Sequence, residues 1–422
     1  MRFDTKTLHG AHNPADSKNC IPVPIYLTTA FNFNDVQYAA DLFDLKTPGD
    51  IYTRLSNPTT SVLEERVASL EKGVGALAVS SGQSASTIAV LNIAQAGDDI
   101  VASSQLYGGT VNLLGATLKK LGINTIFVKE DDAEAYRKAI TPKTRCIFIE
   151  CLGNPKLNVA DIETIAKVAH ENNIPLIVDN TVPSPYLLNP IDFGADIIVH
   201  SLTKYINGHG NSMGGIIVDC GTFDWAKSGK FPELTEPDET YHGLSYTESF
   251  GKMAYIVKAR AQLLRDLGAC ISPINAYLTM LGLETLHLRM QRVSDTGLKV
   301  AKYLQNHPKI TMVSYPKLEG TPYYELAKKY LPKGGSSLIG FRVQGGREGG
   351  TRFIENLKML IHATNLGDSR SIITYPALTT HRQLNDEQLI ACGITNDFMR
   401  LSVGLEDADD IIEDIEQALS FV

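Results

Sequence analysis

Short apolar runs alternate with amphipathic stretches between residues 76 and 218, and this alternation restricts the fold more than any other feature. The apolar runs are 76–79, 99–102, 125–128, 146–149, 174–179, 197–199 and 214–218. Between them, helical spacing predicts helices over 111–121, 132–140 and 161–172. Buried strands joined by helices form an α/β fold with a mostly parallel, doubly wound sheet. Ligands of such sheets bind beyond the carboxyl ends of the strands.

The pattern of apolar and turn-forming residues changes twice along the sequence, so we expect the chain to have three structural parts. Residues 1–58 carry several turn-forming residues and little periodicity, which indicates an extended arm. Residues 59–254 hold the alternating runs and are expected to form the large domain. Residues 255–422 are expected to form a smaller C-terminal α+β domain. Its longest helical patterns and its strands lie at 253–267, 275–288, 338–343 and 399–403.

Composition excludes several classes of protein. The chain has 422 residues and a formal net charge of -8, and no basic patch dominates, so nucleic acid is not an expected partner. No apolar run is long enough to span a membrane, and the start lacks the apolar core of a signal peptide. The scattered cysteines indicate a reduced, cytoplasmic protein rather than a disulfide framework. They are Cys20, Cys146, Cys151, Cys220, Cys270 and Cys392.

Two of the apolar runs lead into charged side chains that are costly to bury. Run 174–179 ends in Asp179, and run 197–199 is followed by His200-Ser-Leu-Thr-Lys204. A buried charge needs a partner, and neighbouring strands would bring this lysine and this carboxylate to one edge of the sheet. Pyridoxal phosphate (PLP) uses both groups, a lysine for its Schiff base and a carboxylate for its pyridinium nitrogen.

Lys204 by itself is compatible with two other roles. Most lysines are solvated at the protein surface. The string Ser201-Leu-Thr-Lys204 also matches the Ser-x-x-Lys pattern of serine acyl-enzymes. The Ser-Asp-Asn and Lys-Thr-Gly elements that accompany that pattern do not occur in the chain, which argues against an acyl-enzyme.

Two further segments follow strands and suit a phosphorylated aromatic ligand. Residues 78–86 predict a strand, a glycine turn and a helix start, where free N–H groups and the helix dipole favour a phosphate. The alternative is an ordinary serine-capped helix. Tyr107 precedes two glycines and could stack on a cofactor ring, or it could be a half-buried loop tyrosine.

The histidines do not predict a metal site. Their spacings match no standard zinc pattern, so we expect no metal and interpret them as polar loop residues or as hydrogen-bond donors behind the site. Those considered are His9, His12, His200, His209 and His242.

Together these segments resemble the Cys/Met-metabolism family of PLP-dependent enzymes. The resemblance covers nearly the whole chain, and its most specific part is Asp179-Asn-Thr together with His200-Ser-Leu-Thr-Lys204-Tyr-Ile-Asn-Gly-His. It implies a fold-type I PLP-dependent transferase, the aspartate-aminotransferase-like architecture. Within the family, the similarity is greatest to members that act on O-acetylhomoserine. The segments that carry this similarity are 151–161, 221–225, 231–243 and 265–273.

The resemblance implies a role for each matching residue. Lys204 would form the Schiff base and carry protons, Asp179 would bind the pyridine nitrogen, and Tyr107 would stack on the ring. The implied phosphate cradle consists of Ser81, Gly82, Gln83, Ser201 and Thr203. The implied substrate-binding residues are Arg400, which would grip the carboxylate as a bidentate guanidinium, with Asn154, Ser371 and Tyr52.

The resemblance also implies an oligomer and a reaction. Tyr52 and Arg54 match a pair that reaches the phosphate of the neighbouring subunit, so a homo-oligomer with shared sites is expected, with a dimer of dimers as its form. The implied reaction is γ-replacement, in which sulfide or a thiol displaces acetate from O-acetylhomoserine to give homocysteine or a homologue. A methionine γ-lyase, a cystathionine γ-synthase and a silent PLP-fold binding module remain alternatives. Members that degrade methionine usually carry cysteine where this chain has Gly109, which argues against the first.

Overall fold

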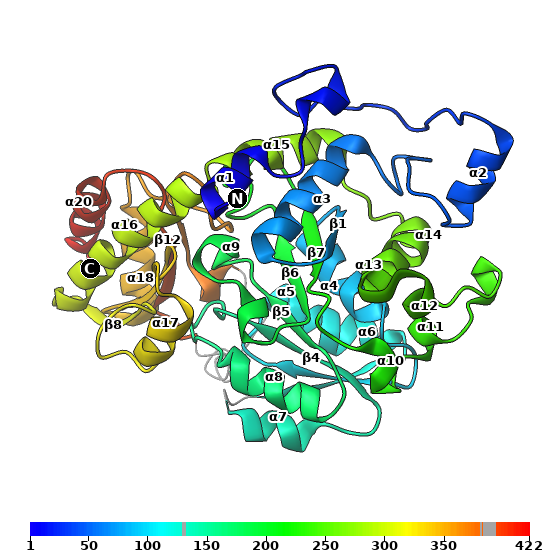
Figure 1. The fold of residues 1–422 in the computed structure, drawn as a ribbon. Coiled ribbons are helices and arrows are strands. Elements are labelled where there is room, and N and C mark those ends of the chain that lie inside the picture. Colours follow the sequence, from blue (N-terminus) through cyan, green and yellow to red (C-terminus); the bar gives the residue numbers. More distant parts are fainter. Residues whose placement is uncertain (129–131, 380–381, 383–393) are drawn as a thin grey trace.

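The computed structural model of the chain describes residues 1–128, 132–379, 382 and 394–422, and these residues form two sheets (Figure 1). The larger sheet has the strand order β1-β7-β6-β5-β4-β2-β3. Its strands are β1 (Gly75–Val79), β2 (Asp99–Ser103), β3 (Asn124–Val128), β4 (Thr144–Glu150), β5 (Leu176–Asp179), β6 (Ile197–Ser201) and β7 (Gly215–Asp219). Only β7 runs antiparallel to its neighbours, so the expected mostly parallel sheet is confirmed.

Helices cover both faces of the larger sheet because successive side chains of each strand point to opposite faces. Val178 and Ile198 join one buried cluster with α3 (Pro58–Glu71) and α8 (Ile162–Glu171). Ile177 and Ile197 join a second cluster with α4 (Gly82–Leu91) and α13 (Ala254–Lys258). This explains why the strands are almost continuously apolar.

The remaining helices near the larger sheet are short. They are α5 (Gly108–Asn112), a π-helical turn (Leu113–Thr117), α6 (Leu118–Lys120), α7 (Ala133–Ala139), α9 (Ser184–Leu187), η3 (Pro190–Phe193), α10 (Trp225–Ser228), α11 (Pro232–Thr235), η4 (Glu239–Tyr241), α12 (Tyr246–Phe250) and η5 (Gly251–Met253). The predicted helix 253–267 is interrupted, because a π-helical turn over Ala259–Leu264 separates α13 from α14 (Arg265–Leu267). In the described ranges, no helix is long and apolar enough to cross a membrane.

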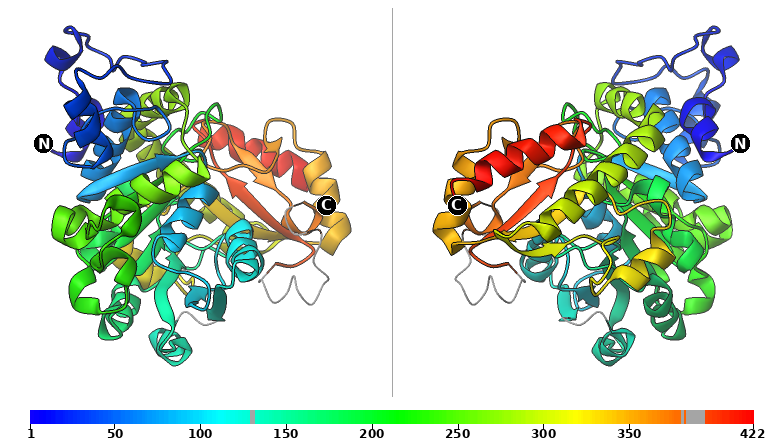
Figure 2. Two further views of the ribbon diagram at one scale, coloured as in Figure 1. Left: turned by 90° about the vertical axis from the view of Figure 1, so that its right-hand side faces the viewer. Right: turned by 90° about the vertical axis from the view of Figure 1, so that its left-hand side faces the viewer.

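The smaller sheet has the order β10-β11-β12-β9-β8 and lies at one end of the molecule (Figure 2). Its strands are β8 (Ile310–Ser314), β9 (Leu338–Val343), β10 (Ile361–His362), β11 (Ile372–Thr374) and β12 (Phe398–Ser402). The elements around it are α16 (Leu286–Asn306), α17 (Tyr324–Tyr330), α18 (Gly346–Glu355), η7 (Pro376–Leu378) and α20 (Ala408–Leu419). The expected smaller α+β unit is therefore present.

The helix predicted over 275–288 is two helices, α15 (Pro273–Glu284) and α16, which meet at Thr285. α13 packs on β1 and β7, and α15 packs on α3. The change in sequence pattern after residue 254 marks the start of the long helical segments, whereas the first helix that packs on the smaller sheet is α16. We therefore propose a boundary near residue 285 rather than at 254/255.

The N-terminal 58 residues are less irregular than the sequence suggests. They contain α1 (Phe3–His9), η1 (Pro14–Ser17) and α2 (Val36–Phe43). α1 packs on α3 and α15, whereas α2 and its flanking loops project from the body of the molecule (Figure 1). Apolar side chains along the projecting part are exposed, with Ile21 at 87% and Val36 at 88%. That residues 1–58 form an arm that contacts a neighbouring subunit remains a prediction.

Candidate active site

Lys204 lies in the turn that follows β6, and its side chain reaches toward the smaller sheet. Its Nζ donates a hydrogen bond to Oδ1 of Asn365 at 2.7 Å. Burial, and to a smaller extent the nearby Arg400 cation, together lower the pKa of Lys204 from 10.5 to about 8. Near neutral pH, a useful fraction of this amine is therefore unprotonated, as a nucleophile or base requires.

Asp179 is the last residue of β5, and Glu150 is the last residue of β4 beside it in register. Burial raises the pKa of Asp179, and the hydrogen bonds from Thr181, including its N–H to Oδ1 at 2.9 Å, oppose that shift. Burial and the Asp179 carboxylate raise the pKa of Glu150 well above its usual range. Oε2 of Glu150 accepts the backbone N–H of Tyr107 at 2.7 Å. The strand ends therefore hold two carboxyls and anchor the loop of Tyr107.

Glu150 was missed in the sequence analysis, although the same signal that marks Asp179 was present. It directly follows the apolar run 146–149, so a second acid at a strand end could have been recognised. Tyr107 itself is 50% exposed, with its ring available for a flat ligand.

The predicted phosphate cradle lies at the N-terminus of α4. Ser81 is its N-cap and accepts the backbone N–H of Ser84 at 3.1 Å. A Cβ at Gly82 would lie 2.7 Å from Cβ of Ser201, so β6 and the start of α4 are in direct contact. Oε1 of Gln83 is buried without a hydrogen-bond partner among the described residues. Thr203 bonds the backbone of Gly214 at 3.2 Å and orders the loop beside the cradle.

Arg400 brings β12 of the smaller sheet to the same place. Its guanidinium donates to Oδ1 of Asn154 at 2.9 Å, to the carbonyl of Asn365 at 3.1 Å and to Oγ1 of Thr374 at 3.2 Å. Within the described ranges, no carboxylate pairs with Arg400, and its buried Nε has no acceptor. A buried cation surrounded by neutral acceptors suits an incoming carboxylate.

Ser371 does not fit its predicted substrate-binding role. Its residue is fully buried, its hydroxyl donates to Oε2 of Glu406 at 2.9 Å, and it accepts the N–H of Gly404 at 2.8 Å. Asn365 occupies the place expected for such a residue, because it contacts both Lys204 and Arg400. No pattern around Asn365 in the sequence indicates this role.

The other predicted residues lie outside this cluster. Arg54 lies over the ring of Tyr52 at 5.2 Å, and the structure records no contact of either residue with Lys204 in the described chain. His200 is in strand β6 rather than in a loop, and its Nε2 bonds Oε1 of the buried Glu71 at 2.7 Å. Trp225 and Phe231, from the segments that carry the resemblance, pack in the core, where Trp225 stacks on Tyr255.

The residues of this site offer a suitable group for each part of the PLP molecule. The backbone N–H groups of Gly82 and Gln83, at the start of α4, suit the phosphate, whereas the exposed Tyr107 ring suits the pyridine face. Asp179 offers a carboxylate at the strand end, and Lys204 offers an amine of lowered pKa.

Comparisons with known proteins agree with this geometry. The model of the "Cys/Met metabolism PLP-dependent enzyme" family matches residues 4–420. The chain is 52% identical to an O-acetyl-L-homoserine sulfhydrylase from Leptospira meyeri, over 99% of this chain and 96% of that one. It is 44% identical to a homocysteine/cysteine synthase from Saccharomyces cerevisiae, over 100% of this chain and 98% of that one.

A solved structure from Campylobacter jejuni is similar with a TM-score of 0.97 and 41% identity, and the match covers 100% of both chains. That protein carries an N'-pyridoxyl-lysine-5'-monophosphate residue. A family match over almost every residue, a fold of the same kind and a site built for the cofactor lead to one conclusion: the chain belongs to the Cys/Met-metabolism family of PLP-dependent enzymes.

Proposed function

We propose that this protein is an O-acetylhomoserine sulfhydrylase, which joins sulfide to the four-carbon unit of O-acetylhomoserine and releases acetate. The observation that carries the proposal is the bridge formed by Asn365, whose side chain binds Lys204 and whose carbonyl binds Arg400. Asn365 thus lies between the Arg400 cation, which would bind the substrate carboxylate, and the Lys204 amine, which would transfer the proton. Chemistry at the Cα of an amino acid needs both groups near this carbon. Relatives at 43% and 52% identity that are named O-acetyl-L-homoserine sulfhydrylases support this choice of substrate.

The substrate carboxylate binds at Arg400. Its guanidinium is held in place by Asn154 and Thr374, so little side-chain freedom is lost when the carboxylate arrives. The unpaired Nε of Arg400 offers a donor to that carboxylate. This contact fixes the Cα of the substrate close to Lys204.

Lys204 acts as the proton carrier. With a pKa near 8, the unprotonated Nζ of Lys204 would take the proton from Cα and, once it has given that proton up, would take a proton from the neighbouring Cβ; both carbons regain a proton in the product. Asn365 Oδ1 holds Nζ at 2.7 Å and so directs the amine toward these carbons.

Bound PLP supplies the electron sink that stabilises negative charge at Cα. Asp179 would offer a negative partner at the strand end, and Tyr107 would cover the ring face, its loop anchored by Glu150. At Cγ the bond to the acetate oxygen breaks, and a bond to the sulfur of sulfide forms. The products are homocysteine and acetate.

Gly109 disfavours the methionine γ-lyase alternative. A Cβ at this position would lie 2.5 Å from Nε2 of Gln83 and 2.5 Å from Cε1 of Tyr107. A cysteine here would therefore have to displace the stacking ring or the cradle side chain. The glycine lets the ring of Tyr107 and the side chain of Gln83 both lie close to this position.

Competition among substrates tests the proposal. We would measure kcat/KM for O-acetylhomoserine, O-succinylhomoserine, O-phosphohomoserine, O-acetylserine and methionine, with sulfide, methanethiol or cysteine as the sulfur donor. We expect the highest value for O-acetylhomoserine with sulfide, and homocysteine as the product. A higher value for methionine alone would indicate a γ-lyase, and a higher value for O-succinylhomoserine with cysteine would indicate a cystathionine γ-synthase.

We also propose that each site is shared between two copies of the chain in a homo-oligomer, with a dimer of dimers as its form. The guanidinium of Arg54 is turned to the ring of Tyr52, and neither contacts the cradle of its own chain in the described residues. The exposed apolar side chains of residues 21–43 give a second copy a surface to cover. The phosphate at α4 would then receive Tyr52 and Arg54 from the neighbouring subunit.

A further inference from the structure

Arg289, in the first turn of α16, is a buried cation whose guanidinium binds neutral oxygens. It is 7% exposed, and burial lowers its pKa from 12.5 to about 10, which leaves it protonated at neutral pH. Among the described residues, no aspartate or glutamate forms an ion pair with it. Such a residue is costly unless its N–H groups are well used.

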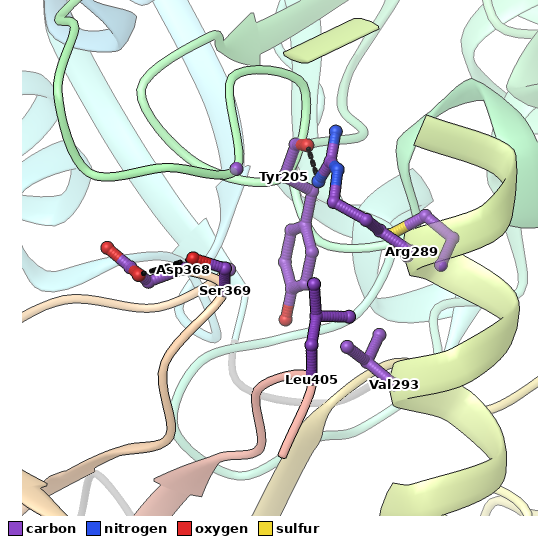
Figure 3. Close-up of a pocket in the computed structure, with 9 residues that line it drawn as sticks. Tyr205, Arg289, Val293, Asp368, Ser369 and Leu405 are labelled. Carbon is purple, nitrogen blue, oxygen red and sulfur yellow. Dashed lines mark hydrogen bonds between the residues drawn. The ribbon is translucent and has the colours of Figure 1, made fainter. Parts of the chain in front are cut away.

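The guanidinium uses its N–H groups on neutral oxygens of two separate segments. Nη1 donates to the carbonyl of Tyr205 at 2.7 Å, as Figure 3 shows, and Nη2 donates to the carbonyls of Gly282 at 2.6 Å and Ile206 at 3.4 Å. Nε donates to Oγ1 of Thr285 at 3.2 Å. Gly282 belongs to the last turn of α15, and its carbonyl also accepts the N–H of the C-cap residue Thr285 at 3.2 Å. Arg289 therefore joins the end of α15 to the two residues that follow Lys204.

Two glycines allow the turn after Lys204 to approach Arg289 and α15 closely. Gly208 has φ +73°, and a Cβ there would lie 2.0 Å from Nη1 of Arg289. A Cβ at Gly282 would lie 1.9 Å from the carbonyl oxygen of Asn207. The turn after Lys204 can approach α15 and Arg289 this closely only because both positions lack side chains.

The other side of the same turn is held by the smaller sheet. The hydroxyl of Tyr205 bonds Oγ of Ser337 at 2.5 Å, and Ser337 bonds Ser402 on β12 at 3.1 Å. Between Tyr205 and Arg289 the structure leaves a cavity of about 10 Å³, room for about one water, lined also by Asp368 and Ser369 (Figure 3). The turn thus has little space to shift while Arg289 is present.

We propose that Arg289 is a positioning residue for Lys204: it clamps the carbonyls of Tyr205 and Ile206 and so holds the lysine amine beside Asn365 and Arg400. It does not touch the reacting atoms. The proposal deepens the proposed function, on which it rests, by assigning to α16 the placement of the proton carrier.

The test uses the purified full-length holoprotein and four variants. Arg289→Lys keeps the charge but loses the planar fork, and Arg289→Met removes the charge. Gly208→Ala keeps Arg289 but crowds its guanidinium and strains the turn at a φ of +73°. Arg292→Met is the matched control, because Arg292 lies on the same helix with an exposed side chain and a single long contact to the carbonyl of Glu406 at 3.4 Å. Cofactor content and thermal unfolding are measured first.

Three readouts follow: the pH midpoint of the bound cofactor's absorbance change, the site of borohydride fixation, and kcat separately from KM for O-acetylhomoserine. We expect the Arg289 and Gly208 variants to keep fixation at Lys204. Their midpoint should move to higher pH, because a loosened turn solvates the lysine nitrogen and favours its charged form. We expect kcat to fall by about a hundredfold, the effect of a small misplacement, with KM unchanged. Arg292→Met should match the wild type.

Several results would overturn the proposal. If folded Arg289→Lys has the absorbance midpoint and the kcat of the wild type, the charge of Arg289 is sufficient and the clamp by its planar fork is wrong. Equal shifts in Arg292→Met would assign it to α16 as a whole. If neither Arg289 variant folds, an unaltered midpoint in Gly208→Ala overturns the clamp. Should the wild type fail to convert O-acetylhomoserine, the proposed function is wrong, while the absorbance midpoints still decide the role of Arg289.

Discussion

At the scale of single residues, Asn365 and Ser371 show how two polar side chains near one site can do different work. Asn365 contacts Lys204 and Arg400, whereas Ser371 contacts Glu406 and Gly404 in the core. Asn365 lies at the proposed reacting centre, and Ser371 supports the loop behind it.

We predict opposite consequences for Asn365→Ala and Ser371→Ala. Asn365→Ala should lower kcat/KM by roughly tenfold or more, because a hydrogen bond to a charged group contributes about 1.5–3 kcal/mol, and should leave thermal unfolding nearly unchanged. Ser371→Ala should destabilise the fold by about 1–3 kcal/mol, because it leaves a buried N–H and a carboxylate oxygen unpaired, and should leave KM unchanged. Steady-state kinetics and thermal unfolding of both variants decide this; a raised KM in a stable Ser371→Ala would restore Ser371 to the site.

Asp179→Asn should retain bound cofactor yet lose activity by roughly a hundredfold or more, since a fixed charge at the reacting centre is removed. The amide can still accept the N–H of Thr181, so the strand end should fold as before. Cofactor content is read from absorbance and turnover from homocysteine formation. Near-normal turnover in a folded variant would show that Asp179 is not the partner of the pyridine nitrogen.

At the scale of the elements, direction along the sheet separates chemistry from support. The parallel strands β4, β5 and β6 end in Glu150, Asp179 and Ser201 at the site. β7 runs the other way, so its last residue, Asp219, lies at the opposite edge. Asp219 is buried, and its Oδ2 has no hydrogen-bond partner among the described residues. Its carboxyl is therefore a cost to the fold rather than part of the site.

Asp219 predicts a pH dependence of stability. Burial raises its pKa from 3.8 to about 7, with a smaller contribution from Asp196. Between these values the folded chain holds a proton that the unfolded chain releases, so this group's contribution to stability falls as the pH rises through that range. Asp219→Asn removes the effect and keeps an acceptor for the N–H of Gly221.

The variant should therefore gain stability relative to the wild type as the pH increases from 5 to 8. Thermal unfolding of both proteins at these two pH values gives the comparison. A difference in unfolding temperature that stays constant with pH would mean that Asp219 is ionised throughout.

At the scale of the whole molecule, the projecting N-terminal part is where the proposed sharing of the site between subunits can be tested. We predict that Arg54→Ala and Lys204→Ala are each inactive and that mixing the two chains restores part of the activity. A mixed dimer regains one complete site if Arg54 acts on the neighbouring subunit. Activity is measured after the chains have been unfolded and refolded together, with each variant refolded alone as the control. Mixed oligomers that form and remain inactive would contradict the shared site.

The sequence by itself determined the alternation of strands and helices and the residues at the strand ends. These are local properties: apolar periodicity, capping residues and turn formers act within a few positions. The placement of Asp179 at a strand end, of Lys204 just after a strand and of Ser81 at a helix start could therefore be predicted. Even there, local signals misjudged continuity, since the predicted helix 275–288 breaks at Thr285.

Only the tertiary structure decided which distant residues meet. Lys204 and Asn365 are 161 positions apart, and Arg289 reaches Tyr205 across 84 positions. Such contacts depend on how two sheets and the helix between them pack together, which no spacing in the chain records. For the same reason Ser371 could not be separated from Asn365 in advance, because the hydroxyl's partner Glu406 lies 35 positions away in the folded core.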